Sequence, residues 1–329
     1  MIVNNNRENI NKLKNIIFKT ISPLINNDFI LLDIPNHRNI GDSLIWKGEK
    51  EFFKDLEYKC LGEFNRYTFR KEVINDVNTV ILLHGGGNFG DLYLSSQLFK
   101  RMIIESFPKN RIVLLPQTVD YLNEGNKDLD FNIFNKHNDL YFLLRDKESF
   151  DIVENRLFEK GKLFLCPDMA FYLDYDKFVV NKNNPLKTLL LSRTDGEAVK
   201  EDISNVVKED EFDISDWPTY NYRNSFLNKI NNYYEVLEGK ICNYLKYLPG
   251  GTKLFDSAYG FKKKGSMELH ISEGIKFLNV YDKVYTTRLH GLILCVLLNK
   301  EIVIVDNAHK KCLRFYSCWL KEFNNITLR

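Results

Sequence analysis

The chain has 329 residues, which exceeds the usual size of one domain and favours two domains of roughly 150 residues each. Hydrophobic residues make up 44% and charged residues 27%, a composition that supports a buried core and a solvated surface. With 46 basic and 44 acidic residues the net charge is +2, which gives no reason to expect a nucleic-acid-binding surface. No apolar run is long enough to span a bilayer.

The six cysteines are scattered, and no CxxC pair occurs. This pattern favours reduced, buried thiols in a cytoplasmic protein over a disulfide framework or a zinc site. We therefore expect no structural metal. The six positions are Cys60, Cys166, Cys242, Cys295, Cys312 and Cys318.

The N-terminal segment predicts an amphipathic helix, because its apolar residues recur at three- and four-residue steps. These residues are Ile10, Leu13, Ile17, Ile21 and Leu24. Asparagine and lysine interrupt the apolar residues, and no small-residue cleavage site follows, so the segment does not resemble a targeting signal. The apolar face either packs on the protein's own core, which we favour, or rests on a membrane surface.

Strand-like and helix-like segments alternate along the first half. A predicted strand at residues 29–34 is followed by a loop and by a helix that ends at Phe53. The segments VILLHGGG, RIVLLPQT and LYFLLRD repeat the pattern, since each is an apolar run that ends in glycine, proline or polar residues. Such runs are typical of buried parallel strands with helices between them.

The second half repeats this alternation after a predicted linker at residues 179–187. TLLLSRTDGE and KVYTTRLHG predict strands and their loops, LILCVLLN a buried helix, and EIVIVDNAHKK a further strand; the polar segment 200–267 has weak periodicity and no assignment. The two series predict an α/β protein with two doubly wound domains that face each other across a cleft. Ligands of such sheets bind beyond the carboxyl ends of the strands, so the residues that follow strands are the candidates for a site.

The glycine-rich segment HGGGNFGD spans residues 84–91. Consecutive glycines permit positive φ angles and close approach of a ligand, and the start of a following helix attracts anions. The segment has neither the GK[ST] of a P-loop nor the GxGxxG of a dinucleotide fold, so neither nucleotide cofactor is expected. Its candidate site residues are Gly86, Gly87, Asn88 and Asp91, and the alternative is a tight turn without function.

Arg288 and His290 follow a predicted strand directly and begin an apolar helix. Arg193 occupies the corresponding place after the first strand of the second half. Two arginines in one crevice suit a ligand that carries both a carboxylate and a phosphate, although each could instead serve a salt bridge within the fold. Lys310 or Lys311, after the next strand, is placed to reach a phosphate, and the alternative is a solvated loop without that role.

The segment NIGDSLIWKG, residues 39–48, contains the letters GDSL that open the nucleophile block of one class of serine esterases. That class also has a C-terminal DxxH, which residues 306–309 match, but its oxyanion block is not matched. We interpret Asp42 or Ser43 as the cap of the following helix. Asp42 remains a site candidate, and Asp168 in CPDMAF likewise follows a strand-like run and is either a site residue or a helix cap.

Seven segments together resemble the polysaccharide pyruvyl transferase family in order and rough spacing, from about residue 39 to about residue 319. They are NIGDSLIWKG, LLHGGGNFGD, LLPQT, LLRDKES, CPDMAF, LLLSRTDGE and TTRLHGLIL. The resemblance implies two Rossmann-like domains arranged as in GT-B glycosyltransferases. Residues 1–180 would form the N-terminal domain on the acceptor side, and residues 181–329 the C-terminal domain on the phosphoenolpyruvate side.

The resemblance also implies a reaction. Phosphoenolpyruvate would be the donor, and its carbon skeleton would join two hydroxyls of a sugar as a cyclic pyruvate ketal, with release of phosphate. The donor-binding arginine of the family falls on Arg193, and its RLH triplet falls on Arg288, Leu289 and His290. Lys310 is a weaker match, and His290 is the candidate catalytic residue, since histidine can move a proton near neutral pH.

The expected partners are phosphoenolpyruvate and a sugar acceptor of a cell-surface or exopolysaccharide precursor, either free or lipid-linked. We expect no cofactor and no metal, and a cytoplasmic location that allows contact with the inner face of the membrane. A GT-B nucleotide-sugar glycosyltransferase is the main alternative, but the paired glutamates of many such enzymes are absent after Val284. A GDSL-type esterase and a non-catalytic sugar-binding protein are the further alternatives.

Overall fold

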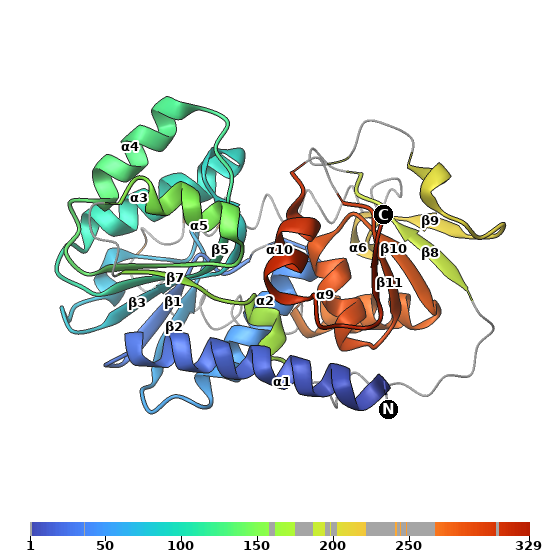
Figure 1. Cartoon of the computed structure of the whole chain (residues 1–329). Coiled ribbons are helices and arrows are strands. Elements are labelled where there is room, and N and C mark those ends of the chain that lie inside the picture. Colours follow the sequence, from blue (N-terminus) through green and yellow to red (C-terminus); the bar gives the residue numbers. More distant parts are fainter. Residues whose placement is uncertain are drawn as a thin grey trace.

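The computed structural model contains two parallel β-sheets, each with helices packed against it (Figure 1). The residues that it describes are 2–35, 37–157, 162–174, 187–194, 198, 203–221, 241, 244, 248, 267–306 and 309–329. The predicted linker, except for Lys187, and most of segment 200–267 lie outside these residues. The α/β class with doubly wound parallel sheets is confirmed, whereas the GT-B arrangement and the domain boundary stay predictions.

The first unit runs from the N-terminal helix to the 3₁₀ helix that follows Asp168. Its helices are α1 (Ile2–Ile21), α2 (Ile40–Phe53), α3 (Leu94–Ser106), α4 (Glu124–Phe134) and α5 (Lys147–Glu154), with short 3₁₀ helices η1 (Ser22–Leu24), η2 (Lys71–Val73), η3 (Asp91–Tyr93) and η5 (Met169–Tyr172). Its strands are β1 (Phe29–Leu32), β2 (Cys60–Phe64), β3 (Val80–Leu83), β4 (Gly86–Phe89), β5 (Ile112–Val119), β6 (Leu140–Leu144) and β7 (Leu163–Leu165). They pair in parallel in the order β2-β1-β3-β5-β6-β7, and β4 pairs separately with β5.

The second unit has a smaller sheet. Its strands are β8 (Thr188–Leu191), β9 (Asp213–Ser215), β10 (Lys283–Thr286), β11 (Glu301–Ile304) and β12 (Ile326–Leu328). Its helices are η7 (Ser204–Val206), α6 (Pro218–Asn221), a helix over residues 267–279, α9 (Leu289–Leu297) and α10 (Lys311–Trp319). The described strands are parallel, in the order β12-β11-β10-β8-β9.

Alternate residues of the central strands enter two separate cores, as the period of two in a strand requires. In β1, Phe29 and Leu31 pack with α1 and α2, whereas Ile30 and Leu32 pack with α3 and α4 on the opposite face. Both faces of the first sheet are therefore covered, which explains why its strands read as unbroken apolar runs.

One hydrophobic core is shared by both units. It contains the apolar face of α1, residues of α2 and η5 from the first unit, and α9 and α10 from the second. The five apolar residues predicted for the N-terminal helix are at most 8% exposed, which confirms that this face packs on the protein's own core. Among the described helices, none combines the length and the hydropathy of a bilayer-spanning segment.

Gly48 allows α2 to lie directly against η5. A Cβ atom at this position would lie 2.0 Å from the carbonyl oxygen of Met169, which is backbone and cannot move aside. The packing of α2 on η5 fixes the position of Asp168, the residue that caps η5 by accepting from the Ala170 N–H at 2.9 Å. This cap confirms one of the two alternatives predicted for Asp168.

Two local predictions were wrong. The glycine-rich segment is not a simple turn into a helix, because Gly86–Phe89 forms β4 beside β5 and the next α-helix begins only at Leu94. The cap of α2 is neither Asp42 nor Ser43. It is Asn39, whose side chain accepts from the Gly41 N–H at 3.0 Å.

Candidate functional site

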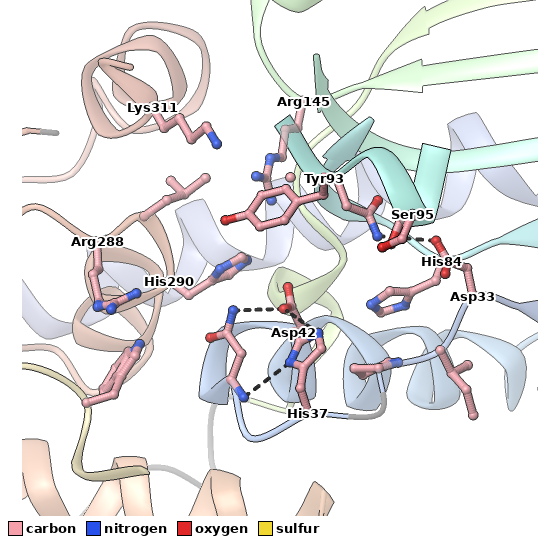
Figure 2. A pocket seen from close by; sticks show the side chains of 18 of the residues that line it. Asp33, His37, Asp42, His84, Tyr93, Ser95, Arg145, Arg288, His290 and Lys311 are labelled. Carbon is pink, nitrogen blue, oxygen red and sulfur yellow. Dashed lines mark hydrogen bonds and ion pairs between the residues drawn. The ribbon is translucent and has the colours of Figure 1, made fainter. Parts of the chain in front are cut away.

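A cavity of about 290 Å³ lies between the two units, at the carboxyl ends of their strands (Figure 2). This is the place that the doubly wound fold predicts for a ligand. From the first unit it is lined by Asp33, Ile34, Pro35, His37, Asn39, Asp42, Arg66, His84, Gly87, Asn88, Tyr93, Ser95, Ser96 and Arg145, and from the second by Arg193, Trp217, Arg288, Leu289, His290 and Lys311.

Most of the predicted site residues line this cavity, namely Asp42, Gly87, Asn88, Arg193, Arg288, Leu289 and His290. Gly86, Asp91 and Lys310 do not. The carboxylate of Asp91 instead accepts from the Leu122 and Asn123 N–H groups and holds the chain that leads into α4. Lys310 precedes α10 with a left-handed φ of 53°, and its neighbour Lys311 is the lysine at the cavity.

His290 is the second residue of α9 and lies against the first turn of α2. A Cβ atom at Gly41 would lie 2.4 Å from His290 Nδ1, so the ring fits only because position 41 has no side chain. On its other nitrogen, Nε2 lies 3.3 Å from Asp168 Oδ2. His290 therefore belongs to the second unit but is held by two residues of the first.

Asp168 also binds the guanidinium of Arg145, with Nη1 2.6 Å from Oδ2. Burial alone would raise the pKa of this carboxyl, but the charge and hydrogen bond of His290 and the charge of Arg145 outweigh burial and hold the pKa well below its usual range. Asp168 is thus a buried carboxylate that joins a cation from β6 to the histidine of α9. Arg145 was missed in the sequence, although it directly follows a predicted strand.

Arg288 lies at the cavity with its guanidinium bound to Asp216. Its Nη2 lies 2.6 Å from Asp216 Oδ2, and its Nε donates to the other carboxylate oxygen. The salt bridge considered for this arginine thus exists, and it holds the guanidinium at the cavity wall. Asp216 follows β9, in the segment that had no assignment. Arg193, whose N–H donates to Thr287 Oγ1 at 3.1 Å, is partly exposed at the same wall.

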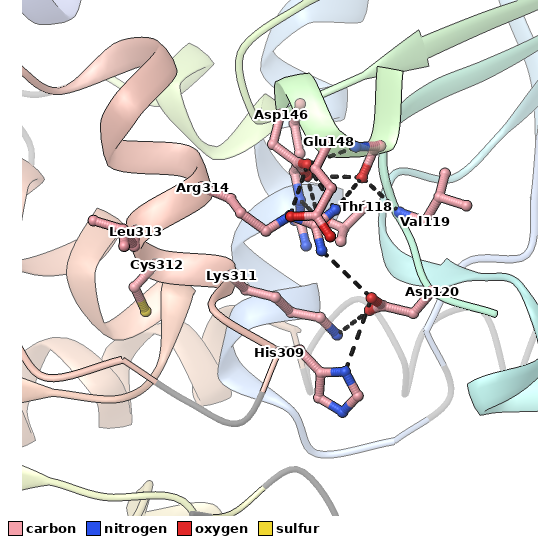
Figure 3. A network of polar contacts seen from close by, with 12 residues as sticks. Thr118, Val119, Asp120, Asp146, Glu148, His309, Lys311, Cys312, Leu313 and Arg314 are labelled. Carbon is pink, nitrogen blue, oxygen red and sulfur yellow. Dashed lines mark hydrogen bonds and ion pairs between the residues drawn. The ribbon is translucent and has the colours of Figure 1, made fainter. Parts of the chain in front are cut away.

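A network of polar contacts joins α10 to the first unit beside the cavity (Figure 3). Lys311 Nζ lies 2.9 Å from Asp120 Oδ2, and Asp120 follows β5. Arg314, one turn further along α10, lies 2.7 Å from Asp146 Oδ1. Both units therefore supply charges to this contact, which sets the position of Lys311 relative to the cavity.

Ser43 does not have the surroundings of an esterase nucleophile. Its Oγ donates to the Asn39 carbonyl at 3.1 Å and lies 3.3 Å from Nδ1 of His270. His309, the histidine of the DxxH match, lies instead 3.9 Å from Asp120. Ser43 is also buried and does not line the cavity, so its hydroxyl is not presented to a ligand bound there.

His84 lies at the opposite end of the cavity from Arg288 in Figure 2 and forms a buried pair with Glu49. His84 Nδ1 lies 2.7 Å from Glu49 Oε2, and Glu49 Oε1 accepts from the Gly85 N–H at 2.9 Å. Burial alone would lower the pKa of His84, but the charge and hydrogen bond of Glu49, with the charges of Asp42 and Asp33, outweigh burial and raise the pKa. This pair was also missed, because its members are distant in the sequence.

Replacing Glu49 with glutamine is expected to destabilise the protein in a pH-dependent way. A raised folded-state pKa means that His84 contributes stability fully below its unfolded pKa of about 6.5, and that this contribution is lost as pH rises through the folded-state pKa. The variant should lose about 3 kcal/mol at pH 6, the order of a broken buried pair, and less at higher pH. Urea unfolding over a pH series measures this difference.

The control for this experiment is Glu51→Gln on the same helix. Glu51 pairs with Lys47 and Lys54, and its pKa is lowered, so its effect should stay constant above pH 6. A Glu49→Gln effect that is equally independent of pH would show that His84 is not charged in the folded protein.

Asp33 lies near the same end of the cavity and is held by a buried lysine. Lys100 Nζ lies 2.9 Å from Asp33 Oδ2 and 2.8 Å from Asn88 Oδ1. Asp33 has a left-handed φ of 64°, which directs the chain sharply after β1. A metal site is not indicated here, since the described residues contain no group of three or more side chains able to hold a metal ion.

Comparison with known proteins finds a matching family profile and several relatives. The profile of the polysaccharide pyruvyl transferase family matches residues 39–309. EpsO of Bacillus subtilis, provisionally named a pyruvyl transferase, is 31% identical over 300 residues that cover 89% of this chain and 86% of EpsO. Pyruvyl transferase 1 of Schizosaccharomyces pombe is 24% identical, over 88% of this chain and 69% of its own.

A solved structure shares the fold. The crystal structure of a functionally uncharacterised protein from Klebsiella pneumoniae has a TM-score of 0.60 to this chain, at 20% sequence identity. The match covers 96% of this chain and 98% of the Klebsiella chain. At this identity the match shows a common fold and carries no information about the reaction.

Proposed function

Because this chain belongs to the polysaccharide pyruvyl transferase family, we propose that it transfers pyruvate from phosphoenolpyruvate onto two hydroxyls of a sugar. The product is a cyclic pyruvate ketal on a cell-surface or exopolysaccharide precursor, and phosphate is released. The observation that carries the choice of donor is the set of cations at one wall of the cavity, Arg145, Arg193, Arg288 and Lys311. Phosphoenolpyruvate presents a carboxylate and a phosphate, and guanidinium groups bind both.

Three of these cations are held in place by carboxylates behind them. Asp168 holds Arg145, Asp216 holds Arg288, and Asp120 holds Lys311. Groups fixed before the substrate arrives need little reorganisation during the reaction, which is the condition for strong electrostatic stabilisation. These three carboxylates also compensate the charges of the cations at the cavity wall.

The chemistry requires proton transfers at defined atoms. One sugar hydroxyl forms a bond to C2 of phosphoenolpyruvate and gives up its proton, while C3 gains a proton and becomes a methyl group. The bond between C2 and the phosphate oxygen breaks, and an oxocarbenium-like centre forms. The second hydroxyl then adds to C2 and loses its proton, which leaves with the phosphate or the solvent.

His290 is suited to move one of these protons. The carboxylate of Asp168 accepts a hydrogen bond from Nε2 of His290 and orients the ring. When the ring is neutral, Nδ1 of His290 therefore carries the lone pair. A histidine oriented by a buried carboxylate is a common arrangement for general acid–base catalysis. Leu289 of the RLH triplet is buried in the shared hydrophobic core and lines the cavity, beside Arg288 and His290 in the sequence.

Phosphoenolpyruvate should raise the melting temperature of the wild-type protein, and Arg193→Ala should abolish this rise. A ligand at 100 times its Kd stabilises by about 2.7 kcal/mol, a change that differential scanning fluorimetry resolves. Arg193 is the suitable position because its side chain is partly exposed, so its loss should affect the ligand more than the fold.

Arg111→Ala is the matched control, since Arg111 pairs with Asp139 away from the cavity and its removal should leave the ligand-induced rise intact. Stabilisation by a nucleoside diphosphate, with none by phosphoenolpyruvate, would instead support a glycosyltransferase. Mass spectrometry of the products from a panel of glycosides then identifies the acceptor and the ketal.

A further inference from the structure

The end of the cavity that contains His84 and Asp33 has hydrogen-bonding groups that the fold leaves unused. Nε2 of His84 is buried and has no hydrogen-bond partner among the described residues. Asp33 binds Lys100 and Asn88 through Oδ2 alone, and within the described part of the chain Oδ1 makes no hydrogen bond. Buried polar atoms are almost always satisfied in proteins, by protein groups or by water, so an unsatisfied nitrogen on a residue that lines a cavity is available to a ligand.

Asp33 and His84 directly follow two neighbouring strands and lie at the same level of the sheet. Leu32 and Leu83 are paired in the register of β1 and β3, and Asp33 and His84 are the residues that follow them. The His84 N–H donates to the Leu32 carbonyl at 2.9 Å, which fixes the two chains side by side. The side chains are therefore presented from adjacent strand ends into one region of the cavity.

Both side chains are also held rigidly. Glu49 accepts from Nδ1 of His84 and is itself fixed by the Gly85 N–H. The remaining nitrogen, Nε2, is then a hydrogen-bond donor whenever the ring is charged. Lys100, which is fully buried, fixes the carboxylate of Asp33. One donor and one acceptor thus have set positions without a ligand.

The lining residues of the cavity include two carboxylates, Asp33 and Asp42, which would repel the carboxylate and phosphate of phosphoenolpyruvate. Arg66 also lines this end, where it donates to Ser95, and Lys100 neutralises Asp33, so the end carries charges of both signs, whereas Arg145, Arg288 and Lys311 attract the anionic groups of the donor. An uncharged hydroxyl both donates and accepts a hydrogen bond, so it suits a site made of one donor and one acceptor. Sugar hydroxyls fit this end better than any anionic part of the donor.

We infer that the region around His84 and Asp33 is the subsite for the acceptor hydroxyls, where His84 donates through Nε2 to one hydroxyl oxygen and Asp33 accepts from a hydroxyl through Oδ1. Glu49 is a positioning residue, since it acts only through His84. The inference rests on the proposed function, because it places the acceptor beside a donor bound at the arginines. It names the residues of the first unit that would recognise the diol.

Histidine NMR tests this subsite separately from the donor site. The protein is labelled with ¹⁵N at its six histidines, and His84→Gln and His290→Gln variants assign the two rings. Phosphoenolpyruvate and a panel of neutral methyl hexopyranosides with free hydroxyls are added in separate titrations. We expect the glycosides to shift the ring nitrogens of His84 and phosphoenolpyruvate to shift those of His290.

The two titrations test the acceptor subsite and the donor site separately. If no glycoside of the panel shifts His84, or if the glycosides shift only His290, the acceptor subsite is overturned even when phosphoenolpyruvate binds as expected. If phosphoenolpyruvate leaves His290 unchanged, the proposed donor site fails, and the glycoside titration still decides whether His84 contacts a sugar. Asp33→Asn should weaken glycoside binding about tenfold without changing phosphoenolpyruvate binding.

His137→Gln is the control for the loss of a buried histidine. Its Nε2 contacts the Phe107 carbonyl at 3.0 Å, and it does not line the cavity. This variant should bind glycosides like the wild type. His84→Gln should bind them about tenfold more weakly, because glutamine is not held by Glu49 in the same orientation. Equal glycoside affinity in the two variants would also overturn the subsite.

Discussion

Replacing His290 with glutamine is expected to lower turnover by about 100-fold or more, with a much smaller loss of affinity for phosphoenolpyruvate. Glutamine keeps a hydrogen-bond donor near Asp168, but it cannot carry a proton near neutral pH. The reaction must deliver a proton to C3 of the donor and remove protons from two hydroxyls. His290 lies at the cavity with a buried carboxylate 3.3 Å from its Nε2, so it is placed for one of these transfers. Steady-state kinetics with varied donor give kcat and KM separately.

A matched control is His270→Gln. His270 lies 3.3 Å from Ser43 Oγ and does not line the cavity, so its replacement should leave kcat close to that of the wild type. If His290→Gln raises only KM, the ring positions the donor and has no role in proton transfer. If both constants stay near their wild-type values, His290 is not part of the site.

Removing Asp168 is expected to have the largest effect on stability. Asp168→Ala should lower the free energy of unfolding by about 3–5 kcal/mol, because it leaves the buried guanidinium of Arg145 without its carboxylate. It also removes the cap of η5 and the hydrogen bond to His290. Urea unfolding measures the stability, and turnover should fall as well, since the histidine loses the group that orients it.

Asp139→Ala is the comparison for this loss. Its partner Arg111 is partly exposed, and such pairs contribute about 1 kcal/mol or less. Similar losses in the two variants would mean that the buried pair is not an important source of stability. Asp168→Asn separates the two roles of Asp168, because asparagine can still cap η5 but carries no charge.

Much of the fold and part of the site could be predicted from the sequence. The apolar residues of α1 recur with the period of a helix, which the sequence shows directly. The strands of the first sheet are buried on both faces, so they consist of unbroken apolar runs that can also be recognised in the sequence. Arg193 and Arg288, chosen as polar residues after strands, do line the cavity, and the same rule applied to each predicted strand would have found His84 and Arg145. It would not have found Asp33, because the strand predicted at residues 29–34 extends past the observed end of β1 at Leu32.

The remaining features depend on contacts that a single sequence does not record. The carboxylate that binds Arg288 is Asp216, 72 positions away in a segment without clear periodicity. Asn39, Asp42 and Ser43 are all good capping residues, so the residue types alone could not place the start of α2. Gly86–Phe89 became a strand because β5 continues past Leu114, its last residue paired with β3, and offers a free edge there.

The GDSL tetrapeptide shows how the same letters can have a different physical role. Gly41 makes room for the ring of His290, and Asp42 lines the cavity. Burial opposes the ionisation of Asp42, but the charges of His37, His290, His84 and Arg145 outweigh burial and lower its pKa. The serine donates to the Asn39 carbonyl and lies beside Nδ1 of His270, so it serves the packing of the fold away from the cavity.

The hydrophobic core shared by the two sheets has a consequence for how the chain unfolds. Leu31 and Leu82 of the first sheet, and Leu191 and Val284 of the second, belong to the same buried cluster, which α1 helps to close. Separating the sheets would expose this cluster to water, and each sheet would lose the apolar contacts that stabilise it. The topology has two parts, but the chain should melt as one cooperative body, so neither half is expected to be a self-sufficient folding unit.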